Sequence, residues 1–175
     1  MAICVSQKNM PFGESLFDAE IFEREVLHRL TEEYSAEKVT WSSVWKAPVN
    51  WKVGNIPNVP SVTFDVIPMR GVNAVSHQVV FPIRNDCLLT LRFSQHQLMS
   101  GNLEQRDAMI DRSSMIELSE LIISSLVLQL SASTQSLLEA EGSNASGISP
   151  NVKPLKWTTE EEDLKYQDYL KRSGS

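Results

Sequence analysis

The chain has 175 residues, of which 42% are hydrophobic and 22% charged, and its formal net charge is -6. This length suits one domain with a buried core, and the composition is globular rather than disordered. The acidic balance and the absence of any run of basic residues argue against nucleic-acid binding, and no apolar stretch approaches the roughly 20 residues that span a bilayer.

The first predicted elements are a loose lead-in over residues 1–12 and an amphipathic helix from about Ser15 to Tyr34. Apolar residues recur in this helix at the helical period, and Ser15 with Asp18 three residues later resembles a capping box. The pattern predicts a helix that packs one face on the domain and leaves the other in water. The apolar stripe consists of Leu16, Ala19, Phe22, Val26, Leu27, Leu30 and Tyr34.

A tryptophan-rich extended segment follows this helix. One strand is predicted near Val39–Lys46, and Pro48 places it at a sheet edge because proline cannot donate to a central ladder. The next segment, Gly54–Pro60, is dense in turn residues and is predicted to be a loop. Three of the four tryptophans lie in or beside this region: Trp41, Trp45 and Trp51.

The clearest pattern in the chain is the alternation of apolar and polar residues from Ser61 to Gln95. A period of two predicts strands, here an antiparallel sheet with one apolar face. The first strand is Ser61–Pro68, and Met69–Ser76 connects it to the next. We assign the apolar face to Val62, Phe64, Val66, Val79, Phe81, Ile83, Leu89, Leu91 and Phe93, and the outer face to Thr63, Asp65, Gln78, Val80, Thr90 and Arg92.

The same pattern predicts the register of the last two strands. Matching their apolar faces leaves an odd-numbered connection, Asn85–Cys87. A two-residue Asn85–Asp86 hairpin would place Arg92 opposite Val79 and bury a charge beneath the apolar face, so the pattern argues against it. The predicted pairs are Ile83 with Leu89, Phe81 with Leu91, Val79 with Phe93 and His77 with Gln95.

A long helix is predicted to cover the apolar face of the sheet. A polar loop over Gln97–Leu103 precedes it, and the helix runs from about Glu104 to Leu138. Its apolar stripe spans about half the circumference, which suits a helix that lies across a sheet. The stripe consists of Ile116, Leu118, Ile122, Ile123, Leu126, Val127 and Leu130.

The last part of the chain is predicted to be a linker followed by a short helix. Thr159 with Glu162 resembles a second capping box, and the helix is expected to end near Leu170. Together these elements predict an α+β fold with about four strands. The predicted division is a single α+β domain over 1–141, a flexible linker over 142–157 and a C-terminal helix or tail over 158–175.

The sequence contains no recognisable catalytic or metal-binding motif. A Cys87–His77 pair is argued against by the predicted register, which places the two residues roughly 30 Å apart at opposite ends of one hairpin. Cys4 and Cys87 do not suggest a disulfide scaffold, and no secretory signal begins the chain, so we expect free thiols in a cytoplasmic protein. The acidic run Glu160–Asp163 is interpreted as a solvated helix cap. We expect no enzyme activity, cofactor or metal.

The tryptophan cluster is the remaining functional signal, because tryptophan is enriched at binding hot spots. The alternative is that these residues are ordinary core at one end of the sheet. With the acidic balance, the cluster favours a non-enzymatic module that binds one protein partner, with a basic partner complementary in charge. Immunity-type inhibitors and secretion chaperones are of this class, and a homodimer stays open. The predicted partner-binding residues are Trp41, Trp45, Trp51, Asp65 and Arg92.

A small-ligand carrier is the second interpretation. Such a protein would have an apolar pocket between the long helix and the sheet. Three phenylalanines on the predicted apolar face separate the two interpretations, because they fill this space if the protein carries no ligand. They are Phe64, Phe81 and Phe93.

Overall fold

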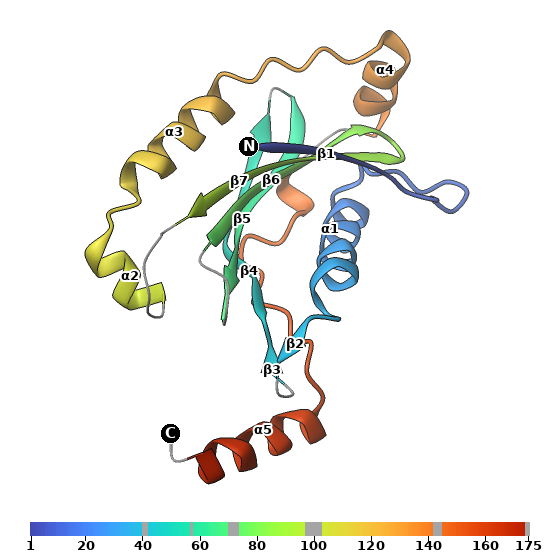
Figure 1. Ribbon diagram of the computed structural model, residues 1–175. Coiled ribbons are helices and arrows are strands. Elements are labelled where there is room, and N and C mark those ends of the chain that lie inside the picture. The colour runs from blue at the N-terminus through green and yellow to red at the C-terminus, as the bar shows by residue number, and fades with distance from the viewer. Residues whose placement is uncertain (40–41, 57, 70–73, 97–102, 142–144, 174–175) are drawn as a thin grey trace.

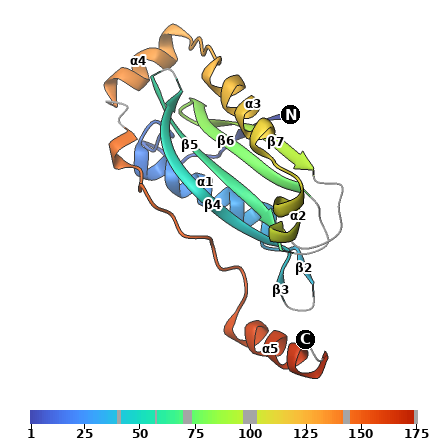
Figure 2. The same cartoon turned by 90° about the vertical axis from the view of Figure 1, so that its left-hand side faces the viewer.

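The structure is a computed structural model that describes residues 1–39, 42–56, 58–69, 74–96, 103–141 and 145–173. Its centre is an antiparallel sheet of five strands in the order β1-β7-β6-β5-β4, with helices on both faces (Figures 1 and 2). The predicted α+β class and antiparallel sheet are confirmed. No helix in the described ranges has both the length and the apolar character needed to cross a bilayer.

The element bounds differ from the predicted ones at the N-terminus, in the C-terminal half and in the middle of the chain, where two paired strands occupy most of the predicted Gly54–Pro60 loop. The strands are β1 (Ala2–Gln7), β2 (Lys38–Val39), β3 (Ser42–Ser43), β4 (Trp45–Ile56), β5 (Val59–Pro68), β6 (Ala74–Arg84) and β7 (Cys87–His96). The helices are α1 (Ala19–Tyr34), α2 (Leu103–Met109), α3 (Ser113–Ser124), α4 (Ala132–Ala140), the 3-10 turn η1 (Ala145–Gly147) and α5 (Glu160–Ser173).

The N-terminal segment forms an edge strand, so the prediction of a loose lead-in is wrong for these residues. β1 pairs along its whole length with β7, from Ala2 opposite Arg92 to Gln7 opposite Cys87. The β-branched residues Ile3 and Val5 favour this extended conformation. The strand is short, which explains why its alternation is a weak signal in the sequence.

Helix α1 begins four residues later than predicted. The carboxylate of Asp18 accepts hydrogen bonds from the backbone N–H groups of Glu20 and Ile21, both at 3.0 Å, which makes Asp18 the N-cap. Ser15 instead accepts from the backbone N–H of Phe17. The predicted apolar stripe packs on one face of the sheet, where the core includes Phe22, Val26, Leu30, Val62, Phe64, Val66, Val80 and Leu88.

Both faces of the sheet are covered, so the predicted division into one apolar and one outer face is wrong. Phe64 of β5 pairs with Gln78 of β6, and directly paired residues point to the same face. The face beneath α1 therefore holds Gln78 and Thr90 as buried polar residues. The opposite core, which α3 and α4 help to cover, includes Val79, Phe81, Leu91, Phe93 and Leu138.

The β6–β7 hairpin corrects the predicted register by two residues. The chain turns at Asn85–Asp86, and the predicted three-residue connection is wrong. A register shift between Pro82 and Arg84 absorbs one residue of β6. This bulge restores the apolar match that a regular two-residue hairpin would lose. The observed pairs are Phe81 with Leu89, Val79 with Leu91 and His77 with Phe93.

The predicted long helix is three shorter helices. Helix α3 ends at Ser124, and α4 begins after Ser131, whose hydroxyl accepts from the backbone N–H of Thr134 at 3.2 Å. The segment between them has no regular secondary structure. Its leucines contact the core at every second residue, which is the period of an extended chain. Two of them also fit the helical period on which the predicted stripe is based. These leucines are Leu126, Leu128 and Leu130.

The chain after α4 returns along α1 and β4 before it reaches α5 (Figure 2). Ile148 is buried in the core beneath α1, and the backbone N–H of Leu155 donates to the carbonyl oxygen of Ala47 at 2.8 Å. Trp157 stacks on Tyr34 at a centroid distance of 6.2 Å. Residues 145–157 of the predicted linker thus contact the domain, and the division into units stays a prediction.

Candidate functional site

The predicted tryptophan cluster contributes to internal packing. Trp41 lies outside the described residues. The Trp45 ring meets Tyr34 edge-on at 5.5 Å, and its Nε1 donates to a carboxylate oxygen of Glu37 at 2.6 Å. Trp51 is buried and stacks on Phe64 at 5.7 Å. Trp51 is thus a core residue and Trp45 packs against the same core, and their role in partner binding stays a prediction.

The two charged residues of the predicted site lie on opposite faces of the sheet. Arg92 lies on the α1 side and forms a two-point ion pair with Glu33, with Nη1–Oε1 at 2.5 Å and Nη2–Oε2 at 2.6 Å. Asp65 lies on the α3 side and contacts His77. Asp65 and Arg92 of the predicted partner-binding set therefore do not share one surface.

Strand β1 is the open edge of the sheet. Among the described residues it pairs with β7 alone, so its other side has no strand partner. Met1, Ile3 and Val5 are exposed by 71%, 60% and 63%, and Ala2–Gln7 contains no proline and no charged residue. Proteins usually protect such edges with charges, proline or bulges. This edge is protected by none of these.

The other edge of the sheet, β4, is protected by three features. It contains Pro48, its pairing with β5 is interrupted by two register shifts, and the chain around Leu155 bonds to its Ala47 carbonyl. Each feature hinders the addition of another strand. The contrast identifies β1 as the accessible edge of this sheet.

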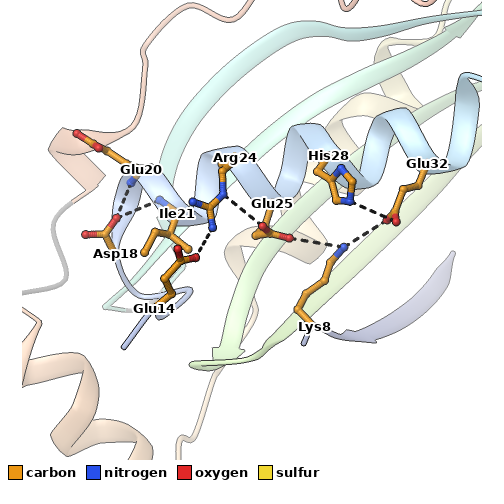
Figure 3. A network of polar contacts seen from close by, with 9 residues as sticks. All are labelled: Lys8, Glu14, Asp18, Glu20, Ile21, Arg24, Glu25, His28 and Glu32. Carbon is orange, nitrogen blue, oxygen red and sulfur yellow. Dashed lines mark hydrogen bonds and ion pairs between the residues drawn. The ribbon is translucent and has the colours of Figure 1, made fainter. Parts of the chain in front are cut away.

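An ion-pair network ties the chain just after β1 to helix α1 (Figure 3). The ammonium of Lys8 lies 3.8 Å from a carboxylate oxygen of Glu25 and 3.5 Å from one of Glu32. Arg24 joins the same row of side chains through its contacts with Glu14 and Glu25. The chain at the end of β1 is therefore tied to α1.

A small apolar groove of about 190 Å³ lies between the start of the chain, β7 and α3. Ile3 and Val5 pair with Leu91 and Leu89, which places them on the same side of the sheet as this groove. The apolar side chains at the groove are Met1, Phe93, Met115, Leu118 and Ile122. Beside it, Leu118 and Leu121 are exposed by 58% and 66%.

The helical layer beside the groove carries charge of one sign. Residues 113–141 contain four acidic residues and no lysine, arginine or histidine, and all four are exposed. An apolar groove beside a helical layer with exposed carboxylates is complementary to an apolar segment that also carries basic residues. The four acidic residues are Glu117, Glu120, Glu139 and Glu141.

A second feature is a polar cavity of about 380 Å³ between the β4–β7 side of the sheet and α3. Asp65 and His77 face it from β5 and β6, and the Asp65 Oδ1 to His77 Nδ1 distance is 2.7 Å. Asn50 donates from Nδ2 to the other Asp65 oxygen at 2.7 Å. The sequence alone does not predict this chain of contacts, because the Asp65–His77 pairing follows from the β5–β6 register.

The composition of these sites does not indicate a metal centre. No group of three or more histidine, cysteine, aspartate or glutamate side chains within the described ranges is arranged to hold a metal ion. Comparison with protein-family models, curated proteins and solved structures gives no match to this chain. The argument for function therefore depends on the geometry of the β1 edge and of the polar cavity.

Proposed function

We propose that this protein is a non-enzymatic binding module that takes up an extended segment of one protein partner along the β1 edge. The observation that carries the proposal is the unprotected edge of Ala2–Gln7 with the exposed side chains of Ile3 and Val5. Immunity-type inhibitors and secretion chaperones are proteins of this functional class. Cytoplasmic residence remains part of this proposal.

The expected binding mode is strand addition. An extended partner segment beside β1 satisfies the backbone N–H and C=O groups that face away from β7, and such main-chain bonds supply affinity with little sequence preference. Alternate side chains of the added strand then lie beside Ile3 and Val5. Burying these two side chains removes apolar surface from water, which favours the complex.

The α3 surface gives this mode its selectivity. Side chains that point to the α3 side meet the groove formed by Met1, Phe93 and Leu118. The exposed carboxylates of Glu117 and Glu120 lie on the same helix. We therefore expect the partner segment to alternate apolar residues with polar ones and to carry lysine or arginine at its ends.

The carrier interpretation has no specific observation in its favour as first stated. Phe64, Phe81 and Phe93 are exposed by 0%, 3% and 8% and belong to the two cores. The cavity between the sheet and α3 is lined in large part by polar side chains. The apolar groove between β7 and α3 is smaller, at about 190 Å³.

The test uses the full chain and two matched lysine substitutions. Val5→Lys places a charge on the open edge, whereas Leu164→Lys places one on α5 at a side chain that is 71% exposed. The wild-type protein first captures a stoichiometric partner from its native cell, and each purified variant is then titrated with that partner. Val5→Lys should weaken binding at least tenfold, and Leu164→Lys should leave it unchanged.

Two outcomes would overturn the proposal. In the first, Val5→Lys binds the partner as tightly as the wild type, so that the contact lies elsewhere. In the second, the purified wild type occupies its own β1 edge as a dimer that Val5→Lys converts to monomer, while no other protein competes for that edge.

A further inference from the structure

The polar cavity between the sheet and α3 has a hydrogen-bonding pattern that selects a ligand class. Asn50, Asp65 and His77 form a chain of contacts along its floor. An ionised carboxylate accepts hydrogen bonds and donates none, so an imidazole with a single proton carries it on Nδ1, where it meets Asp65. The lone pair of the imidazole is then at Nε2, which forms no hydrogen bond with any described residue. His77 therefore offers an acceptor to the cavity.

The backbone of β4 is shaped to hold Asn50 in this chain. Asn50 lies between two register shifts of the β4–β5 ladder and has a φ of 55°. A non-glycine residue in the left-handed region costs free energy, and bulges often redirect a side chain towards a functional site. Here the bulge directs the Asn50 amide to Asp65, and through Asp65 it holds the orientation of His77.

Two donors face the same cavity. Arg112 donates from Nη1 to Gln95 Oε1 at 3.0 Å, and this contact identifies the other end of the Gln95 side chain as its NH₂ group. That group has no acceptor among the described residues, although Gln95 is only 4% exposed. Lys52 forms no ion pair with any described residue. Gln95 and Lys52 thus suit a ligand oxygen, and Lys52 favours one with negative charge.

The remaining lining limits the ligand further. The second guanidinium nitrogen of Arg112 is paired with Asp107 at 2.8 Å, and both oxygens of Asp65 are occupied within the protein. Glu120 faces the cavity from α3, and Ile116 supplies an apolar wall. The cavity therefore combines the imidazole of His77, the amide of Gln95, the ammonium of Lys52, the carboxylate of Glu120 and a small apolar surface.

We propose that this cavity binds a small carboxylate that also carries a hydroxyl group, that is, a hydroxy acid. The hydroxyl donates to Nε2 of His77, and the carboxylate accepts from Lys52 and the Gln95 amide. A hydroxyl donates to Nε2 without placing a second cation beside Lys52. A volume of about 380 Å³ is within the range of small-molecule sites. This site is independent of the β1 edge.

The test compares two probes that differ by one group. Mandelate carries an α-hydroxyl and a carboxylate, and its phenyl ring can contact Ile116, whereas phenylacetate lacks the hydroxyl. NMR titration of the full chain follows the His77 ring signals and reports both affinities. Mandelate should bind about tenfold more tightly, the ratio that one hydrogen bond typically gives.

Three variants assign the contacts. His77→Phe should abolish the preference for mandelate, whereas Lys52→Gln should weaken both probes and keep their ratio. Lys52 is exposed, so this variant should fold even if His77→Phe does not. His28→Gln is the control, because His28 lies on the outer side of α1 with a side chain that is 59% exposed, and it should change neither affinity.

Three results would overturn the proposal. The first is equal binding of mandelate and phenylacetate to the wild type. The second is the absence of any shift of the His77 signals with either probe up to its solubility. The third is tighter binding of phenylglycine, which replaces the hydroxyl by an amine, because it would assign the site to an amino acid.

Discussion

Arg29 of α1 donates from Nη1 to the hydroxyl of Thr90 on β7 at 2.8 Å, across the interface between the helix and the sheet. Its other terminal nitrogen donates to Gln78 Oε1 at 3.1 Å, and the side chain belongs to a residue that is 7% exposed. Burial lowers the pKa of the Arg29 guanidinium. This contact fixes the position of α1 against two strands, because a buried guanidinium needs its acceptors.

Replacing Arg29 should therefore destabilise the fold. Arg29→Met leaves the acceptors on Thr90 and Gln78 without their donor, but it also removes a buried charge. We expect the free energy of unfolding to fall by about 2 kcal/mol as the sum of the two effects. Urea unfolding measures the change. Arg24→Met is the control, because Arg24 is half exposed, and it should stay within about 0.5 kcal/mol of the wild type. Equal effects of the two variants would contradict this role of Arg29.

The buried phenol of Tyr34 should make the free energy of unfolding decrease at alkaline pH. Burial raises the pKa of Tyr34 from 10.0 to about 12, with the Glu33 carboxylate adding to the effect. Below pH 10 both the folded and unfolded states keep the phenol protonated, and the contribution is fully present. Above it the unfolded state ionises first, so stability should fall by roughly 2–3 kcal/mol as the pH rises towards 12.

Phenolate absorbance and denaturant unfolding over this pH range check the Tyr34 prediction. Tyr34→Phe should remove the late step of the absorbance titration and flatten the stability profile above pH 10. A wild-type protein whose three tyrosines all ionise near pH 10 would contradict a buried Tyr34.

Glu23 is predicted to hold the returning C-terminal segment on α1. Its carboxylate accepts from the backbone N–H of Ser149 at 2.6 Å and from the Ser149 hydroxyl at 2.9 Å. Glu23→Gln keeps one acceptor and loses the charge, so the free energy of local opening should fall by about 1 kcal/mol. Amide hydrogen exchange in this segment should then become about fivefold faster. The amides of Ser149 and Leu155 report the change. Glu20→Gln, at an exposed carboxylate of the same helix, should leave both rates unaltered.

The two cysteines should differ in reactivity. Burial, with a contribution from Asp86, raises the pKa of the Cys87 thiol, and Cys87 is 6% exposed. Cys4 is half-buried in the edge strand. Because the thiolate is the reacting form, iodoacetamide should modify Cys4 well before Cys87 in the folded protein. Mass spectrometry of the peptides measures both rates, and comparable rates would contradict the burial of Cys87.

The sequence predicts the fold class well because its strongest signals are local. The stripe of α1 marks its buried face, and the alternation from Ser61 to Gln95 marks extended strands, although Gln78 and Thr90, which it assigns to the outer face, are buried. These patterns do not specify which residues of two neighbouring strands lie opposite each other. A shift of one residue in this register moves every side chain to the other face of the sheet. The apolar pattern also does not predict the bulge between Pro82 and Arg84. A pattern of apolar residues is preserved by either an odd loop or a bulge.

The candidate sites are harder to predict because they depend on pairing between segments. β1 is short, and its role follows from the strand order rather than from its composition. Asp65 and His77 meet through the β5–β6 register, and Asn50 joins them through a bulge. In the region of Leu126 and Leu130, helical and extended periods both fit the sequence, and serines at the end of α3 and at the N-cap of α4 favour the observed break.

The most direct measurement of the central claim is hydrogen exchange of the full chain with and without its bound partner. Strand addition at β1 predicts that the outward-facing amides of Ala2–Gln7 become protected at least tenfold in the complex, together with slower exchange in α3. Val5→Lys should lose this protection under the same conditions. Protection confined to α1, β4 or α5, with unchanged exchange in β1, would contradict the account.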